Sequence, residues 1–191
     1  MIKVSRGNHK LGKDTLILNI TSAAACPSRA LGLCKIATKC YARKAETQYP
    51  AVKPYREAQT KIWDQMSSVE IAMDLVDILT RARPAGSIKY LRFSEAGDFR
   101  DQADVDKMSK IAQLLIAYGV RVYGYTARKD LDFTKVHENM VVNGSGFMVH
   151  NMFTATKLLN IYALDLVCPG NCRDCHKCKS RNQLDIKVLE H

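Results

Sequence analysis

The stretch DTLILNITSAAACPSRALGLCKIATKC, residues 14 to 40, places a short apolar run directly before a polar loop with three cysteines. Leu16, Ile17, Leu18 and Ile20 make the run nearly continuous. This is the pattern of a strand buried on both faces, which is typical of a parallel sheet covered by helices. The stretch therefore predicts a buried strand whose carboxyl end leads into a cysteine loop.

Outward from this stretch, helical and strand-like patterns alternate along the chain. Helical spacing runs from about Pro54 to Thr80 and again over residues 104–119. Further strands are expected in SIKYLRF (87–93), VRVYGYT (120–126), MVV (140–142) or GFMVH (146–150), and IYALDLV (161–167). Such alternation predicts βα units and an α/β fold with a mostly parallel sheet. A complete eight-stranded barrel takes about 250 residues, so an open partial barrel or a doubly wound sheet fits better.

Small, polar or metal-binding residues follow each predicted strand. They occupy positions 21–40, 94–98, 126–128 and 143–145, with Asn151 as an alternative to the last group. Ligands of open α/β sheets bind at the carboxyl ends of the strands. These loops are therefore expected to form the functional site.

Composition favours a cytoplasmic protein with an anionic partner. No apolar run reaches the roughly 18 residues of a membrane helix, and the first residues lack a signal-peptide pattern. Seven cysteines in a reducing compartment are expected to bind metal rather than to form disulfides. The 29 Lys and Arg against 19 Asp and Glu, a formal charge of +10, favour a nucleic acid as partner.

Four cysteines near the end of the chain form a second set, Cys168, Cys172, Cys175 and Cys178. A compact C-x3-C-x2-C-x2-C run is more typical of a cubane iron–sulfur cluster than of zinc, whose usual sites consist of two separated knuckles. Iron–sulfur is favoured, and zinc remains the alternative.

The first set, Cys26, Cys34 and Cys40, supplies only three thiolates, which would leave one iron of a four-iron cluster open. A three-cysteine loop after the first strand, ending in CYA and followed by FSEAGDF after the second strand, resembles the radical S-adenosylmethionine (SAM) superfamily. In that family the open iron chelates SAM, whose reductive cleavage gives a 5′-deoxyadenosyl radical. The likeness extends to small uncharacterised bacteriophage proteins related to the superfamily, and would place the chain in the host cytoplasm.

The resemblance implies roles for residues in the strand-end loops. Glu95 is the nearest match to the glutamate that contacts the methionyl amine, with Asp98 as the spare, and residues after the third strand match contacts to the ribose or carboxylate of SAM. The implied cofactor-binding set is Tyr41, Ser94, Glu95, Gly97, Asp98, Tyr125, Thr126, Arg128 and Asn143.

The cysteine spacing departs from the family pattern. The usual C-x3-C-x2-C is expanded here to C-x7-C-x5-C, while Cys168, Cys172 and Cys175 have the standard spacing. The SAM cluster is still assigned to the first loop, because that loop follows the first strand and the second set has a fourth cysteine that closes its coordination. The second set then holds an auxiliary cluster.

The sequence therefore predicts a partial (βα) barrel over residues 1–167, with the SAM-cluster loop at 21–46 and a cysteine-rich auxiliary segment at 168–191. The expected function is modification of a nucleic acid such as tRNA, including methylthiolation, with an external electron donor such as flavodoxin. A peptide-modifying radical SAM enzyme and a zinc-stapled nucleic-acid-binding module without catalysis are the alternatives. The expected phosphate contacts are Lys35, Lys39, Arg43, Lys44, Arg128, Lys129, Arg173, Lys177, Lys179 and Arg181.

Overall fold

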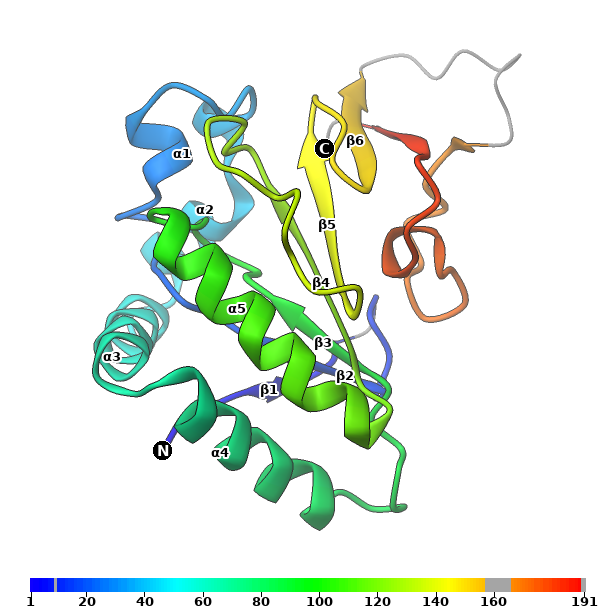
Figure 1. Ribbon diagram of the computed structural model, residues 1–191. Coiled ribbons are helices and arrows are strands. Elements are labelled where there is room, and N and C mark those ends of the chain that lie inside the picture. Colours follow the sequence, from blue (N-terminus) through cyan, green and yellow to red (C-terminus); the bar gives the residue numbers. More distant parts are fainter. Residues whose placement is uncertain (9, 157–165, 190–191) are drawn as a thin grey trace.

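The computed structural model describes residues 1–8, 10–156 and 166–189, and it has an α/β fold built on one seven-stranded sheet (Figure 1). The strands are β1 (Ser5–Arg6), β2 (Thr15–Leu18), β3 (Tyr90–Phe93), β4 (Arg121–Thr126), β5 (Met140–Ser145), β6 (Asn151–Thr156) and β7 (Asp185–Leu189). The α-helices are α1 (Pro27–Ala30), α2 (Tyr41–Gln48), α3 (Val52–Gln65), α4 (Ser68–Arg81) and α5 (Gln102–Leu115), with short 3-10 turns η1 (Ala37–Lys39), η2 (Ile116–Tyr118) and η4 (Lys177–Lys179).

The strands lie in the sheet in the same order as in the chain, from β1 to β7. Only β1 is antiparallel to its neighbour, and every pair from β2 to β7 is parallel. A doubly wound sheet reverses its strand order at a switch point, and this sheet does not reverse. The doubly wound alternative is therefore wrong, and the sheet is wound in one direction.

Winding in one direction puts the crossover helices on one face of the sheet, because parallel crossovers share one hand. The main core lies between this face and the helices α3, α4 and α5. Leu91 and Phe93 of β3 and Val122 of β4 pack there with Ile71 of α4 and Ile111 of α5, all at most 1% exposed.

The helical stretch expected over residues 54–80 is two helices, α3 and α4. A capping box separates them: Ser67 Oγ accepts from the Glu70 amide, and the Glu70 carboxylate accepts from the Ser67 amide. This reciprocal pair starts a new helix at Ser68. The second predicted helix is confirmed as α5 with η2, and it stops at Gly119, whose φ of 67° is left-handed.

The expected strands at SIKYLRF and VRVYGYT are confirmed as β3 and β4, and MVV rather than GFMVH gives β5. The expected strand IYALDLV falls mostly outside the described residues, apart from a bridge between Val167 and Lys187. Strands β6 and β7 were not predicted. Among the described residues, no helix is long and apolar enough to cross a membrane.

The second face of the sheet carries large side chains that alternate with the core residues. We call it the aromatic face and define it by Tyr90, Arg92, Tyr123, Tyr125 and Phe153. The neighbouring aromatic rings contact one another edge to face, and the Arg92 guanidinium lies beside the Tyr125 ring. The C-terminal segment with η4 lies against β4 and β5 on this face. The two faces therefore have different covers, helices on one and the cysteine-rich segment on the other.

Candidate functional site

The first cysteine loop lies at the carboxyl end of β2, where the loops after β4 and β5 also gather (Figure 1). Cys26 precedes α1 and Cys40 precedes α2, while Cys34 lies between them. All three thiols are partly buried. Burial, with smaller contributions from the charges of Asp98 and Cys34, raises the pKa of Cys26 to about 11. The pKa of Cys34 is raised by burial and, to a smaller extent, by the charges of Cys40 and Asp98.

A buried ion pair fixes the start of this loop. Glu46 of α2 accepts from the Ala23 amide at 2.7 Å and from the Ala24 amide at 2.9 Å. Its Oε1 also pairs with Arg56 of α3 at 2.9 Å, and both side chains are about 5% exposed or less. The backbone that leads into Cys26 is therefore held by two helices.

Asp98 joins three loops at the strand ends. Its carboxylate accepts from Ser28 Oγ at 2.6 Å, Thr126 Oγ1 at 2.7 Å, and the Ala127 and Phe99 amides at 2.8 Å. Burial raises the pKa of Asp98, and these hydrogen bonds oppose that rise. The cysteine loop, the FSEAGDF loop and the loop after β4 thus meet at one carboxylate, as the parallel sheet predicted.

The FSEAGDF loop is held tightly against the loop after β2. Asn19 Oδ1 accepts from the Glu95 and Ala96 amides at 2.9 and 3.0 Å. Gly97 has a φ of 72°, and a Cβ there would lie 2.1 Å from Thr21 Cγ2. Only glycine fits this close approach with a left-handed backbone. The loop therefore has a defined shape beside the cysteines.

Glu95 and Tyr41 face a cavity of about 240 Å³, together with Asn19, Tyr55 and Arg56. The Tyr41 hydroxyl donates to the Glu95 carbonyl at 2.6 Å, which fastens the start of α2 to this loop. The Glu95 carboxylate is partly exposed. It is therefore placed to meet a ligand in the cavity.

Other predicted contacts are engaged by the protein itself. Arg128 is 5% exposed and donates to the Phe99 and Arg100 carbonyls at 2.6 and 2.7 Å, while its other donors pair with Asp130. Asn143 is fully buried and donates to the Gly124 and Cys178 carbonyls. Both side chains hold segments of the site in place.

The second cysteine set is docked on the aromatic face. The Tyr125 hydroxyl hydrogen-bonds the Cys178 thiol, and burial raises the pKa of Cys178 to about 11. All four thiols of this set are partly buried. Lys179, 2% exposed, donates to the Cys172 carbonyl at 3.0 Å, and its Nζ lies 4.0 Å from the centre of the Tyr90 ring.

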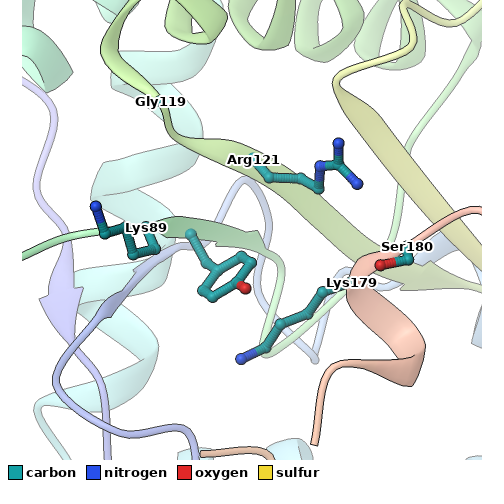
Figure 2. A pocket seen from close by; sticks show the side chains of 6 residues that line it. Lys89, Gly119, Arg121, Lys179 and Ser180 are labelled. Carbon is teal, nitrogen blue, oxygen red and sulfur yellow. The ribbon is translucent and has the colours of Figure 1, made fainter.

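A basic pocket lies at the opposite, amino ends of β3 and β4 (Figure 2). It has a volume of about 260 Å³ and is lined by Lys89, Tyr90, Gly119, Arg121, Lys179 and Ser180. The sequence did not reveal it, because these cations come from three separate segments with no common motif.

Several predicted phosphate contacts are also engaged. Arg181 donates to the Val136, His137 and Met140 carbonyls, and Lys179 is buried. By contrast, Lys35 and Lys129 are exposed in the carboxyl-end loops, and Arg43 and Lys44 are exposed on α2, directly after Cys40. Exposed cations therefore remain near these loops, but they are fewer than the sequence indicated.

No three His, Cys, Asp or Glu side chains within the described ranges converge closely enough to hold one metal ion. Zinc–thiolate bonds are about 2.3 Å long, so four thiols on one zinc would nearly touch. The thiolates of a four-iron cluster bind different irons and lie farther apart. Three plus four partly buried thiols, each set in one segment, fit two such clusters by their donor chemistry.

Together these features define an α/β protein with a sheet wound in one direction and with cysteine-rich segments at its carboxyl ends and on its aromatic face. Residues 2–161, more than four-fifths of the chain, match the family described as Gene product 88 (GP88), and the chain belongs to this family. The match includes Cys26, Cys34 and Cys40 and ends before Cys168. No curated protein and no solved structure matches the chain.

Proposed function

We propose that this chain is a radical SAM enzyme with an auxiliary iron–sulfur cluster, and that it modifies a nucleic acid such as tRNA. One observation carries the proposal. The loop with Cys26, Cys34 and Cys40 meets the Glu95 loop and the loop after β4 at the carboxyl ends of parallel strands, joined through Asp98. Ligands of open α/β sheets bind at this edge.

Cys26, Cys34 and Cys40 are the residues that would hold the open cluster. Such a cluster would supply the chemistry of reductive SAM cleavage. Glu95, at the cavity beside Tyr41, is placed to accept a hydrogen bond from an ammonium group. Ser28 and Asp98 hold α1, and with it Cys26, at a fixed place relative to Glu95. Catalysis by proximity requires that the reacting groups be held in fixed positions relative to one another.

Cys168, Cys172, Cys175 and Cys178 would hold the auxiliary cluster. Tyr125 and Asn143 place this segment by bonding Cys178, and Lys179 fixes the Cys172 backbone. The cluster would thus lie on the aromatic face, on the sheet side opposite the helices. An external donor such as flavodoxin would supply the electron.

The nucleic-acid substrate is supported by charge. Lys35, Arg43, Lys44 and Lys129 are exposed near the proposed site, and the chain as a whole carries a formal charge of +10. Neutralising phosphates in this way contributes sequence-independent affinity. Methylthiolation of tRNA is one reaction that a two-cluster enzyme of this kind would perform.

The alternative is a zinc-stapled binding module. It accounts for the charge and the second cysteine set. It does not account for Cys26, Cys34 and Cys40 beside the fitted FSEAGDF loop.

The test is reductive cleavage of SAM by the anaerobically reconstituted chain. We expect close to eight irons and eight sulfides per chain, and formation of 5′-deoxyadenosine on addition of dithionite. Cys34→Ala should abolish 5′-deoxyadenosine, because the open cluster would lose one of three ligands. Cys175→Ala is the matched control, since it should lower the iron content and leave cleavage.

Stoichiometric zinc with no absorbance near 400 nm would overturn the proposal and leave the binding module. Loss of cleavage in Cys175→Ala with full cleavage in Cys34→Ala would reverse the assignment of the two cysteine sets.

A further inference from the structure

Three buried polar atoms lack a hydrogen-bond partner among the described residues: Arg92 Nε, Ser94 Oγ and Tyr123 Oη. They lie together, because Arg92 and Tyr123 are partners in the β3–β4 register and Ser94 is two residues beyond Arg92. Buried polar atoms are nearly always paired in native proteins, so three unpaired ones in one place need an explanation.

The neighbouring strands offer Arg92 no carboxylate. Strands β3, β4 and β5 contain no Asp or Glu, and within the described part of the chain no acid lies at ion-pair distance from this guanidinium. The Tyr125 ring lies below it, 5.3 Å from the ring centre to the guanidinium carbon. A cation–π contact does not replace the hydrogen bonds that the buried Nε lacks.

The backbone at this place is also unusual. Ser94 has a φ of 51°, the left-handed region that non-glycine residues rarely adopt. Such strain persists where the surrounding structure enforces it, and it is common at ligand sites. The strained residue thus coincides with the unpaired donors.

The unpaired groups all donate hydrogen bonds, which selects an acceptor-rich ligand. A guanidinium with a free N–H, a phenol and a hydroxyl match the oxygens of an oxyanion. Tyr125 and Phe153, whose rings contact edge to face at 5.1 Å, provide aromatic surface next to these donors. An aromatic surface beside an oxyanion site suits a nucleotide, whose base stacks while its phosphate is bound.

We propose that Arg92 and Tyr123 bind the phosphate of a nucleotide on the aromatic face, between the two cysteine sets. On one side, Ser94 precedes Glu95, whose carbonyl accepts from Tyr41 next to Cys40. On the other side, the Tyr123 ring lies 6.0 Å from Lys179 Nζ, which donates to the Cys172 carbonyl. The choice of a nucleotide rests on the proposed nucleic-acid substrate. The oxyanion site itself rests on the unpaired donors.

The probes are adenosine 5′-monophosphate, inorganic phosphate and adenosine, measured by calorimetry on the full chain with and without iron. We expect the monophosphate to bind more tightly than adenosine. Arg92→Met should weaken monophosphate binding about tenfold to a hundredfold and leave adenosine unchanged, since it removes one charged hydrogen-bonding group. Arg81→Met is the matched control, because it removes the same charge from an exposed side chain of α4 on the helical face.

Thermal unfolding of the ligand-free variants gives a readout that a structural role would not produce. Arg92→Met should unfold at the same temperature as the parent or higher, because it removes a half-buried guanidinium whose Nε has no hydrogen-bond partner. If Arg92→Met does not fold, Arg92 is structural and the proposal is wrong for it. Tyr123→Phe removes only the hydroxyl. Severalfold weaker monophosphate binding by this variant would show that the Tyr123 hydroxyl contacts the phosphate.

Equal affinity for the monophosphate in the parent and in both variants overturns the inference. A loss of binding confined to S-adenosylhomocysteine would also overturn the inference, and it would assign Arg92 to the carboxylate of the cofactor. A variant that loses only iron would overturn it too, and would assign Arg92 to balancing the charge of the cluster. Monophosphate binding through Arg92 without any SAM cleavage would retain the oxyanion site while the proposed function fails. SAM cleavage without monophosphate binding would support the proposed function and overturn the oxyanion site.

Discussion

Asp98, after β3, accepts a 2.6 Å hydrogen bond from Ser28, which lies 70 residues earlier in the cysteine loop. The same carboxylate binds Thr126 Oγ1 and the Ala127 amide after β4. One buried side chain therefore sets the mutual position of three loops, and the relative geometry of the proposed site depends on it.

Asp98→Asn should lower the free energy of unfolding by about 2–3 kcal/mol, because the amide nitrogen cannot accept from the donors that now face the carboxylate. Ser28→Ala removes one donor and should cost about 1–2 kcal/mol. Urea unfolding of both variants measures these values. Equal stability of Asp98→Asn and the parent would show that the three loops are held in another way.

Glu46 and Arg56 form the buried pair behind the first cysteine loop. Arg56→Met should lower the free energy of unfolding by about 3–5 kcal/mol, because Glu46 would stay buried with two backbone amides as its only strong donors. Lys53→Met is the control, since its ion pair with Glu57 is exposed and contributes little. Similar losses in both variants, measured by chemical denaturation, would contradict the assigned role.

How much of this arrangement the sequence foretold depends on the range of the interaction. The apolar run at Leu16 to Ile20 and the parallel-sheet rule placed the cysteine loop beside FSEAGDF, and the Ser28–Asp98 bond confirms that the loops meet. The Glu46–Arg56 pair left no local signal, because neither residue belongs to a motif. Strand β6, NMFTAT, has too few apolar residues to be recognised.

Two cations of the C-terminal segment also show what the sequence alone could not predict. Lys179 and Arg181 read as surface charges in a basic segment, yet the structure buries the first and uses the second to bind three carbonyls. A sequence gives the number of charges but not which backbone oxygens they reach. The long-range contacts of the C-terminal segment decided their roles.

His150 gives the fold a pH dependence. Burial, with help from Arg181, lowers its pKa from 6.5 to about 4, and its Nδ1 accepts from the Val142 amide at 2.9 Å. The unfolded chain therefore binds a proton at this residue between about pH 6.5 and pH 4 that the folded chain does not. Its contribution to stability is complete above pH 6.5 and is lost as the pH falls through that range.

His150→Asn keeps an acceptor for Val142 and cannot be protonated. The free energy of unfolding of the parent, minus that of the variant, should be larger at pH 7.5 than at pH 4.5. Urea unfolding across this series measures the difference. A difference that does not change with pH would show that His150 titrates alike in the folded and unfolded chains.

Binding of tRNA should weaken steeply with salt. Changing Lys35, Arg43 and Lys44 to Gln should reduce the slope of log affinity against log salt by about 2, since each phosphate contact on a single strand contributes about 0.7. The control changes Lys61, Arg81 and Lys110, exposed on the helical face, to Gln. Equal slopes in the two triple variants would remove the carboxyl-end loops from the nucleic-acid surface.

The sequential strand order has a consequence for synthesis. Each strand pairs with the one made just before it, so the sheet can grow in the order in which the chain leaves the ribosome. Cys26, Cys34 and Cys40 leave the ribosome before Cys168, Cys172, Cys175 and Cys178, whose segment lies against β4 and β5. The aromatic face is thus formed before the segment that lies against it, and the first three thiols reach their place before the second set.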